Sequence, residues 1–513
     1  MERFLKRHES RIKGIISGFD RVLFRGTLRS ISYSQGIERW LWYQGVRLTE
    51  FALFAEKVSA RLKENAQDIA AKAGRPFQHI LSPKASKEDI ARSIMGRDGI
   101  RKGLICVLSC VEPCRSFTIQ KDRRAKILKL VSGQRQCLHL YFYYADRKFG
   151  LMHVRLQTWL PFNLQVCLNG WEYLARRLDR LGVGYEKRDN CFARIDDLPR
   201  AQRIMDSLLD RRWVRWFDLI ARRVNPWLDS RNGLSLRGYY WTIRQGEYST
   251  DVLFKDTQSL EEVFPDLLRH AVAHFSSKDV LRFLQRRVLS TFNGEIISEM
   301  KHRIEGVRIK HMVEENSIKM YDKQGSVLRI ETTINNPRYW SVWRRATRKG
   351  KQVMTWVPMR KGIGDIRRRA ELSRATNERY LQALSVVGET LPSHKLLDPV
   401  SRRRIRDGRS YRALRPISPE DAELLRLVSD GQFILHGFRN RDLRVKLNLA
   451  GEKDQQTRRR NCACISRTIR LLRAHGLVAK ISRSHRYRVT AKGHQVIATA
   501  IRLRETNALA FAA

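Results

Sequence analysis

Acidic side chains are the first candidates for chemistry in this sequence. Proteins that cut or join nucleic acid strands commonly hold Mg²⁺ between carboxylates that the fold brings together. Glu112 ends an apolar run just before Pro113, and Glu331 lies in an alternating, strand-like stretch. We take these two as candidate catalytic carboxylates, with salt bridges to nearby cations as the alternative role. Four further acids lie beside apolar or turn residues, namely Asp20, Asp251, Glu295 and Glu305.

A hairpin is predicted around Gly325. The stretches on either side alternate apolar and polar residues, and a three-residue loop with Gly325 in a left-handed conformation would join them. This register places Lys319 directly opposite Arg329 on the polar side. Two cations so placed repel each other unless a phosphate or a carboxylate, such as that of Glu331, lies between them. Lys319 and Arg329 are therefore candidate nucleic-acid ligands.

Tyr321 is a candidate nucleophile on the same hairpin. Lys319–Lys323 followed by Leu328–Glu331 resembles a segment of some rolling-circle replication initiators and related phage proteins. Those proteins nick DNA through a tyrosine, with a metal held by histidines, so the resemblance implies that role for Tyr321. The resemblance is confined to this short segment, and the chain lacks a His-x-His pair. Packing within the hairpin is the alternative role of the tyrosine.

Cysteines form the third group of candidates. Cys106, Cys110, Cys114, Cys137 and His139 fall within one predicted sheet, where they could hold zinc. Three residues separate Cys110 from Cys114, which suits a zinc site, but a Cys-x-His pair on one strand is unusual. The alternative is that these cysteines are small buried apolar residues. We therefore assign no metal ligands from the sequence.

Residues 418–504 follow the order helix, helix, helix, basic hairpin, helix. Ser418 and Asp421 suit a capping box, while Gly431 and Gly476 suit the ends of the first and third helices. This order resembles the winged helix-turn-helix modules of the MarR-like kind. The resemblance implies that the third helix enters a major groove while the wing contacts phosphates. A winged helix used for protein contacts is the alternative.

Basic residues are expected to bind nucleic acid in this segment and in the preceding body. On the third helix and the wing they are Arg458, Arg459, Arg460, Arg467, Arg470, Arg473, Arg483 and Arg486. In the body, Arg367 and Arg368 join Lys319 and Arg329. Aromatic residues also alternate with arginine in 211–216 and 338–345, a composition that could stack unpaired bases. For 211–216 we expect instead an aromatic core face on a helix.

The composition favours a polyanionic partner. The 513 residues include 100 Lys and Arg against 52 Asp and Glu, a formal net charge of +48. Since 42% of the residues are hydrophobic, the chain is expected to be globular rather than a disordered basic arm. DNA is the expected partner, and RNA is also compatible with the charge. No apolar run reaches the roughly 18 residues of a membrane span, and no secretory signal is visible, so we expect a cytoplasmic protein without membrane binding.

The predicted fold is a multidomain α+β protein with a mixed-sheet body, helical segments and a C-terminal winged helix. No internal repeat with a fixed period is evident. The expected divisions are a helical N-terminal region (1–100), an α/β core (101–200), a helical segment (201–290), a β-meander with a basic helix (291–390), a basic linker (391–416) and the winged-helix domain (417–513).

These features predict a nucleic-acid-binding protein of a mobile element, phage or plasmid, of the transposase or replication-initiator kind. A plain regulator does not need so large a basic body. If the body is an enzyme, the expected chemistry is metal-dependent strand nicking or transfer, with Mg²⁺ as cofactor. The alternative is a non-enzymatic transcriptional regulator or a protein that binds structured RNA.

Overall fold

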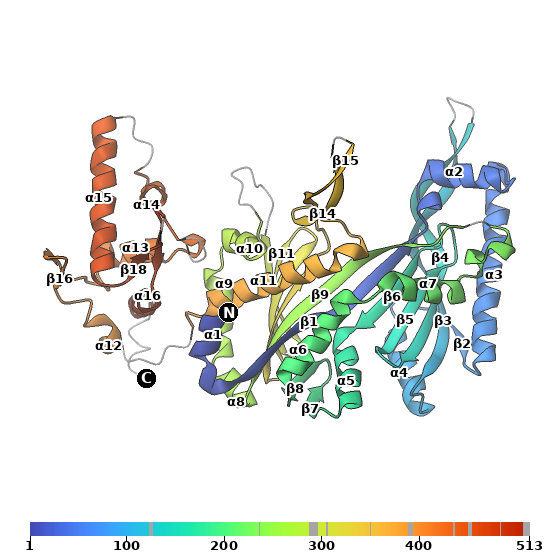
Figure 1. The fold of residues 1–513 in the computed structure, drawn as a ribbon, viewed down its shortest axis with the longest axis horizontal. Helices are drawn as coiled ribbons and strands as arrows, with labels where there is room; N and C mark the ends of the chain where they lie inside the picture. Colours follow the sequence, from blue (N-terminus) through green and yellow to red (C-terminus); the bar gives the residue numbers. More distant parts are fainter. Residues whose placement is uncertain are drawn as a thin grey trace.

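A computed structural model gives the fold of the chain. It describes residues 1–122, 127–234, 236–286, 296–303, 306–348, 350–387, 393–433, 437–449, 454–482 and 484–505. The fold is mixed α+β with a large mixed sheet, as the sequence predicts (Figure 1). None of the described helices is both long enough and apolar enough to cross a membrane.

One eleven-stranded sheet runs through the body in the order β10-β11-β12-β13-β9-β1-β6-β5-β4-β3-β2. Neighbouring strands are antiparallel except β2 and β3. The strands are β1 (Ile12–Thr27), β2 (Phe77–Ile80), β3 (Gly103–Asp122), β4 (Ile127–Asp146), β5 (Gly150–Gln157), β6 (Leu164–Asn169), β9 (Tyr240–Phe254), β10 (Ile296–Arg303), β11 (Gly306–Val313), β12 (Asn316–Lys323) and β13 (Val327–Thr333). The sheet therefore continues across the divisions expected at residues 100, 200 and 290.

The sheet consists of two halves with the same connectivity. In the first half, β1 is followed by helices and by the meander β3–β6, whose last strand returns to pair with β1. In the second half, β9 is followed by helices and by the meander β10–β13, whose last strand returns to pair with β9. The antiparallel pair β1–β9 joins the halves. The sequence shows no fixed period because the helical segments between these strands differ in length.

The N-terminal region is not only helical, because β1 is one of the two central strands of the sheet. Its run Ile15–Phe24 is rich in β-branched, aromatic and other apolar residues, which favour a buried strand over an amphipathic helix. From the sequence alone a strand is apparent only at residues 22–24, whereas β1 has 16 residues. The sequence prediction underestimated it because its polar residues interrupt the apolar run.

Helices cover one face of the sheet in both halves. In α7, Trp213, Phe217 and Ala221 recur at helical spacing and pack against Phe24 and its neighbours, so the predicted aromatic core face of 211–216 is confirmed. In the second half, α11 packs on β9 and β13. The body helices are α1 (Glu2–Arg7), α2 (Ser34–Tyr43), α3 (Phe51–Lys72), α4 (Lys87–Arg97), α5 (Gly170–Leu181), α6 (Leu198–Asp206), α7 (Trp213–Val224), α8 (Thr257–Glu261), α9 (Phe264–His274), α10 (Ser277–Phe283) and α11 (Ile366–Leu384).

Two small two-stranded elements accompany the main sheet. The hairpin of β7 (Tyr185–Arg188) and β8 (Cys191–Ile195) lies against β9 and β13. The ribbon of β14 (Ser341–Arg348) and β15 (Lys351–Pro358) forms a separate two-stranded sheet and projects from the body (Figure 1).

The C-terminal elements form a core of their own at one end of the molecule (Figure 1). They are α12 (Ser393–Leu397), β16 (Arg404–Arg406), β17 (Arg409–Tyr411), α13 (Pro419–Val428), α14 (Asn440–Lys446), α15 (Gln455–Ala474), β18 (Val478–Lys480), β19 (Tyr487–Val489) and α16 (Ala491–Glu505). Ile465, Ile469 and Leu472 of α15 are buried in this core, together with Leu396 and Leu414. The expected basic linker is therefore packed onto the C-terminal unit over its described part, residues 393–416.

Candidate functional site

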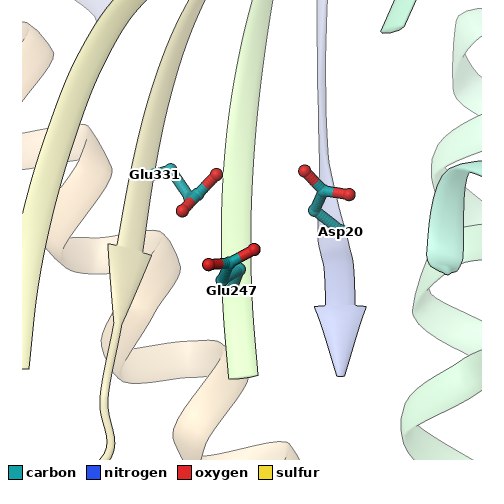
Figure 2. A group of neighbouring side chains, drawn as sticks. All are labelled: Asp20, Glu247 and Glu331. Atoms are coloured by element: carbon teal, nitrogen blue, oxygen red, sulfur yellow. The ribbon is translucent and has the colours of Figure 1, made fainter. Parts of the chain in front are cut away.

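Three carboxylates converge where the two halves of the sheet meet. Asp20 lies on β1, Glu247 on β9 and Glu331 on β13, and one oxygen of each lies within 4.8 Å of the others (Figure 2). The central pairing runs from Ile12 opposite Phe254 to Thr27 opposite Tyr240, which places Asp20 and Glu247 near its middle. Thr332 and Thr250 contact Asn377 of α11. Glu331 and Glu247 are one and three residues away on the same strands, so they face away from α11.

A β-bulge in β1 shapes this cluster. Phe19 pairs with Tyr248 and Val22 pairs with Gly246, so Asp20 and Arg21 together oppose the single residue Glu247. A bulge of this kind turns adjacent side chains toward the same side of a sheet. Asp20 and Arg21 both line the cavity above the cluster as a result.

The β12–β13 hairpin has a register two residues different from the predicted one. Lys319 lies opposite Glu331 and Tyr321 lies opposite Arg329, so the predicted Lys319–Arg329 pair is wrong. Both strands continue further toward the turn than expected, until Lys323 pairs with Val327. A shift of two residues leaves every side chain on its predicted face, because the side-chain period of a strand is two. It replaces a repulsive pair of cations with an ion pair.

Two cations, the half-buried Lys319 and the buried Arg329, neutralise the carboxylates. Lys319 Nζ lies 3.2 Å from Glu247 Oε1 and also contacts Glu331 Oε1. Arg329 is completely buried; its Nη1 donates to Asp20 Oδ2 at 2.8 Å and its Nε to Asp251 Oδ1 at 2.7 Å. Burial costs a charged group several kcal/mol unless partners of opposite charge lie this close. These ion pairs therefore allow four carboxylates to lie together inside the protein.

Burial and neighbouring charges shift the acids in opposite directions. Burial raises the pKa of Asp20 to about 6, although Arg329 opposes this shift. Burial also disfavours the charged form of Glu331, but the charge and hydrogen bond of Lys319, the hydrogen bond from Tyr321 and the charge of Arg329 together outweigh it, so the pKa of Glu331 lies below its ordinary value. Near neutral pH both Asp20 and Glu331 are ionised, and Asp20 is the first of the two to take up a proton as the pH falls.

Tyr321 contacts the cluster through Glu331. Its hydroxyl donates to Glu331 Oε2 at 2.8 Å, and burial together with the charge of Glu331 raises the pKa of the phenol well above its ordinary value. The hydroxyl therefore stays protonated at neutral pH and orients Glu331 through this hydrogen bond.

A cavity of about 550 Å³ lies above the carboxylates. Residues of both halves line it, as do α4, α5 and the β7–β8 hairpin. The cations on its wall, besides Lys319 and Arg329, are Arg21, Arg92, Arg176, Lys187, Arg303, Arg308 and Lys323. The arrangement puts hard oxygen donors at the floor of a cavity whose wall is rich in phosphate-binding side chains.

Comparisons of the chain with protein-family models, curated proteins and solved structures give no match. The geometry of the site therefore carries the interpretation.

Of the candidate catalytic residues, Glu331 and Tyr321 lie in the cluster and Glu112 does not. Glu112 is on β3 at the far side of the first half, where Lys87 lies 2.9 Å and Arg155 2.6 Å from its carboxylate. The Tyr141 hydroxyl also donates to it at 2.6 Å. Asp20 joins the cluster and Asp251 adjoins it through Arg329. Glu295 and Glu305 lie outside the described residues.

The candidate zinc ligands do not assemble as a metal site in the described part of the chain. Cys114 and Cys137 are joined by a disulfide, an outcome that neither interpretation of the cysteines predicted. Cys106 and Cys110 are buried thiols, as expected of small apolar residues. The carboxylate cluster is the one group among the described residues with metal-binding spacing.

Some of the candidate nucleic-acid ligands are exposed, and others already contact side chains or backbone of the protein. Arg458, Arg459, Arg460, Arg467 and Arg470 are exposed on α15. Arg473 is half-buried with its guanidinium over the Tyr487 ring, and Arg486 is also half-buried. In the body, Arg367 pairs with Asp210, and Arg368 pairs with Glu371 and binds Ser341 O. Arg483 lies outside the described residues.

Glu247 is the functional candidate that the sequence prediction missed. It lies in an aromatic, strand-like stretch, directly after Gly246. An acid in the middle of an aromatic, strand-like stretch is unusual and could have marked it. Nothing in its local sequence indicates its neighbours on β1 and β13.

Proposed function

We propose that the body is a divalent-metal-dependent enzyme that cuts or joins phosphodiester bonds in nucleic acid. The observation that carries this proposal is the convergence of Asp20, Glu247 and Glu331 beneath a cavity lined by cations. Carboxylates on adjacent strands supply the ligands, and the surrounding arginines and lysines suit the phosphates of a polyanionic substrate.

The donor set fits Mg²⁺ or Mn²⁺, which prefer oxygen ligands. Asp20, Glu247 and Glu331 would hold the ion, which when bound supplies Lewis-acid activation of a phosphoryl oxygen or of water. Lys319 lies against two of these carboxylates, so an ion must share them with its ammonium group or displace it. The cavity cations would hold the substrate phosphates, and Tyr321 would orient Glu331.

The C-terminal unit would bring the enzyme to DNA. Its order of helices and hairpin resembles a winged helix, with α15 as the helix that enters the major groove. Exposed Arg467 and Arg470 would contact bases, and the wing residues Arg483 and Arg486 would contact phosphates. A targeting unit joined to a larger basic body is typical of the transposase or replication-initiator kind of mobile-element, phage or plasmid protein.

The test is an incubation of the full chain with end-labelled supercoiled and linear DNA in the presence of Mg²⁺ or Mn²⁺. Asp20→Asn, Glu247→Gln and Glu331→Gln should each abolish nicking or joining. Glu88→Gln is the matched control, because Glu88 lines the same cavity outside the cluster. Tyr321→Phe separates two mechanisms: complete loss indicates a tyrosine nucleophile, whereas a partial loss indicates an orienting hydroxyl. A parallel incubation uses end-labelled RNA, and the proposal is wrong if both DNA and RNA stay intact with both metals.

The second candidate is a protein that binds nucleic acid without cutting it, either a regulator or a binder of structured RNA. The ion pairs of Lys319 and Arg329 favour it, since they already neutralise the carboxylates. In that case the acids stabilise the fold, and their amide variants lower the melting temperature without changing any reaction.

A further inference from the structure

The β14–β15 ribbon exposes two tryptophans at its surface. Trp343 and Trp356 are directly opposite each other, and their side chains are 51% and 53% exposed. Their rings lie 5.6 Å apart in an edge-to-face arrangement. Met354, on the same side of the ribbon, is 48% exposed. Exposed aromatic residues gathered on one face usually mark a binding surface.

The ribbon is anchored firmly at its base. Trp340 and Met359, on either side of it, are buried in the second-half core, and Met359 N donates to Trp340 O at 2.8 Å. Arg344 of β14 donates to Asp365 Oδ1 at 2.9 Å, which fixes the first strand of the ribbon to the start of α11. The exposed tryptophans therefore belong to an ordered arm, not to a loosely attached loop.

The ribbon is an addition that only the second half of the sheet contains. In the first half, the chain passes directly from β6, which ends at Asn169, into α5, which begins at Gly170. In the second half, the chain leaves β13 at Thr333 and forms the ribbon before α11 begins at Ile366. Since the shared connectivity does not need it, the ribbon is not required to complete the sheet.

Charge identifies the kind of partner. Residues 341–358 contain five Lys and Arg and no Asp or Glu. Arg345 is exposed on the same face as the tryptophans, and the guanidinium of Arg368 lies 5.6 Å from the centre of the Trp356 ring. An apolar protein partner has no need of this charge, whereas single-stranded nucleic acid offers unpaired bases to the rings and phosphates to the cations.

We propose that the β14–β15 ribbon binds single-stranded nucleic acid, with bases stacked on Trp343 and Trp356 and the backbone held by Arg345 and its basic neighbours. This proposal deepens the proposed function and rests on it, because it assigns unpaired strands as the form of substrate that the body holds. Duplex DNA is a poorer occupant, since its bases are already stacked on one another and its edges offer no face to a tryptophan.

The test is fluorescence anisotropy with the full chain, a labelled oligothymidylate of about 20 nucleotides and a matched duplex, in EDTA. Trp343→Ala and Trp356→Ala should each weaken oligothymidylate binding by about fivefold to a hundredfold. The duplex affinity should stay unchanged, and Trp343→Phe and Trp356→Phe should keep most of the affinity. Trp42→Ala is the matched control, because Trp42 is 73% exposed on α2 and lies outside the ribbon.

Several outcomes would overturn the proposal. The first is unchanged oligothymidylate affinity in the Trp343→Ala, Trp356→Ala double variant. The second is an equal loss of affinity for the single strand and the duplex. The third is a loss of affinity in the phenylalanine variants that is as large as in the alanine variants. A change of oligomeric state in sedimentation would instead show that the ribbon joins copies of the chain. Because the assay contains no metal, its result is independent of any failure of the carboxylate cluster to support catalysis.

Discussion

The two halves of the sheet follow the same path but present different side chains to the cavity. Beside β1, the strand β6 places Cys167 and Asn169, which are uncharged. Beside β9, the strand β13 places Arg329 and Glu331. The shared backbone path therefore does not determine which charges face the cavity; the side chains of each half do.

The charges of the second half are completed by the first half. Arg329 of β13 contacts Asp20 of β1 as well as Asp251 of β9. Buried charges require partners within contact distance, so this network couples the two halves energetically. The first half has its own ion cluster around Glu112, but that cluster lies within the half and includes a partly exposed arginine, Arg155.

The largest expected effect follows from Arg329→Met. This change leaves Asp20 and Asp251 buried without their cation, and the free energy of unfolding should fall by about 3 to 5 kcal/mol. Urea denaturation followed by circular dichroism measures it. Arg329→Lys keeps the charge, but an ammonium group cannot contact Asp20 and Asp251 together as the guanidinium does. Its free energy of unfolding should therefore lie between those of wild type and Arg329→Met. Arg92→Met, at an exposed ion pair, is the control and should change stability by less than about 0.5 kcal/mol.

A smaller loss is expected from Arg155→Met in the first half. Glu112 keeps Lys87 and Tyr141 as partners, so the free energy of unfolding should fall by about 1 to 2 kcal/mol in the same experiment. The comparison of the halves fails if this loss equals or exceeds that of Arg329→Met. Such a result would show that the Glu112 ion pairs stabilise the body at least as much as the Arg329 network does.

Next in size is the effect of pH through Asp20. Its pKa in the folded protein, about 6, is above the ordinary value of 3.8, so the folded state binds a proton more readily than the unfolded state. Stability from this group is therefore greatest below about pH 4 and is lost as the pH rises through 6. Between pH 5 and 7.5, wild type should lose about 1 kcal/mol relative to Asp20→Asn. Parallel pH profiles for the two proteins would contradict the assignment.

The smallest expected effect concerns Lys319 and the divalent ion that is proposed to bind the carboxylates. In Lys319→Met, the ammonium group no longer occupies Glu247 and Glu331, so Mn²⁺ should raise the melting temperature more than in wild type. The additional stabilisation should be below about 1 kcal/mol at millimolar Mn²⁺. Adding Glu247→Gln to this variant should remove the gain. An equal response in wild type and Lys319→Met would indicate that Lys319 does not compete with the ion.

Much of the local structure could be predicted from the sequence, because it depends on neighbouring residues. The α7 core face follows from residues at helical spacing, and the hairpin faces follow from alternation. The hairpin register could not be predicted, since it depends on how far both strands continue when β9 and β11 pair with them. Glu112 and Glu331 had equally suitable local patterns, and only the position of each strand in the sheet separates them.

The sequence by itself determined the basic character of the chain and its α+β class. It was also enough to select Asp20, Tyr321 and Glu331 as candidates for chemistry. Only the tertiary structure decided that Glu247 meets them, that Lys319 faces Glu331 rather than Arg329, and that Glu112 stays apart. The physical reason is that strands distant in the chain become neighbours through long-range pairing. The order β13-β9-β1 and the bulge at Asp20 depend on the packing of the whole sheet, which no local pattern records.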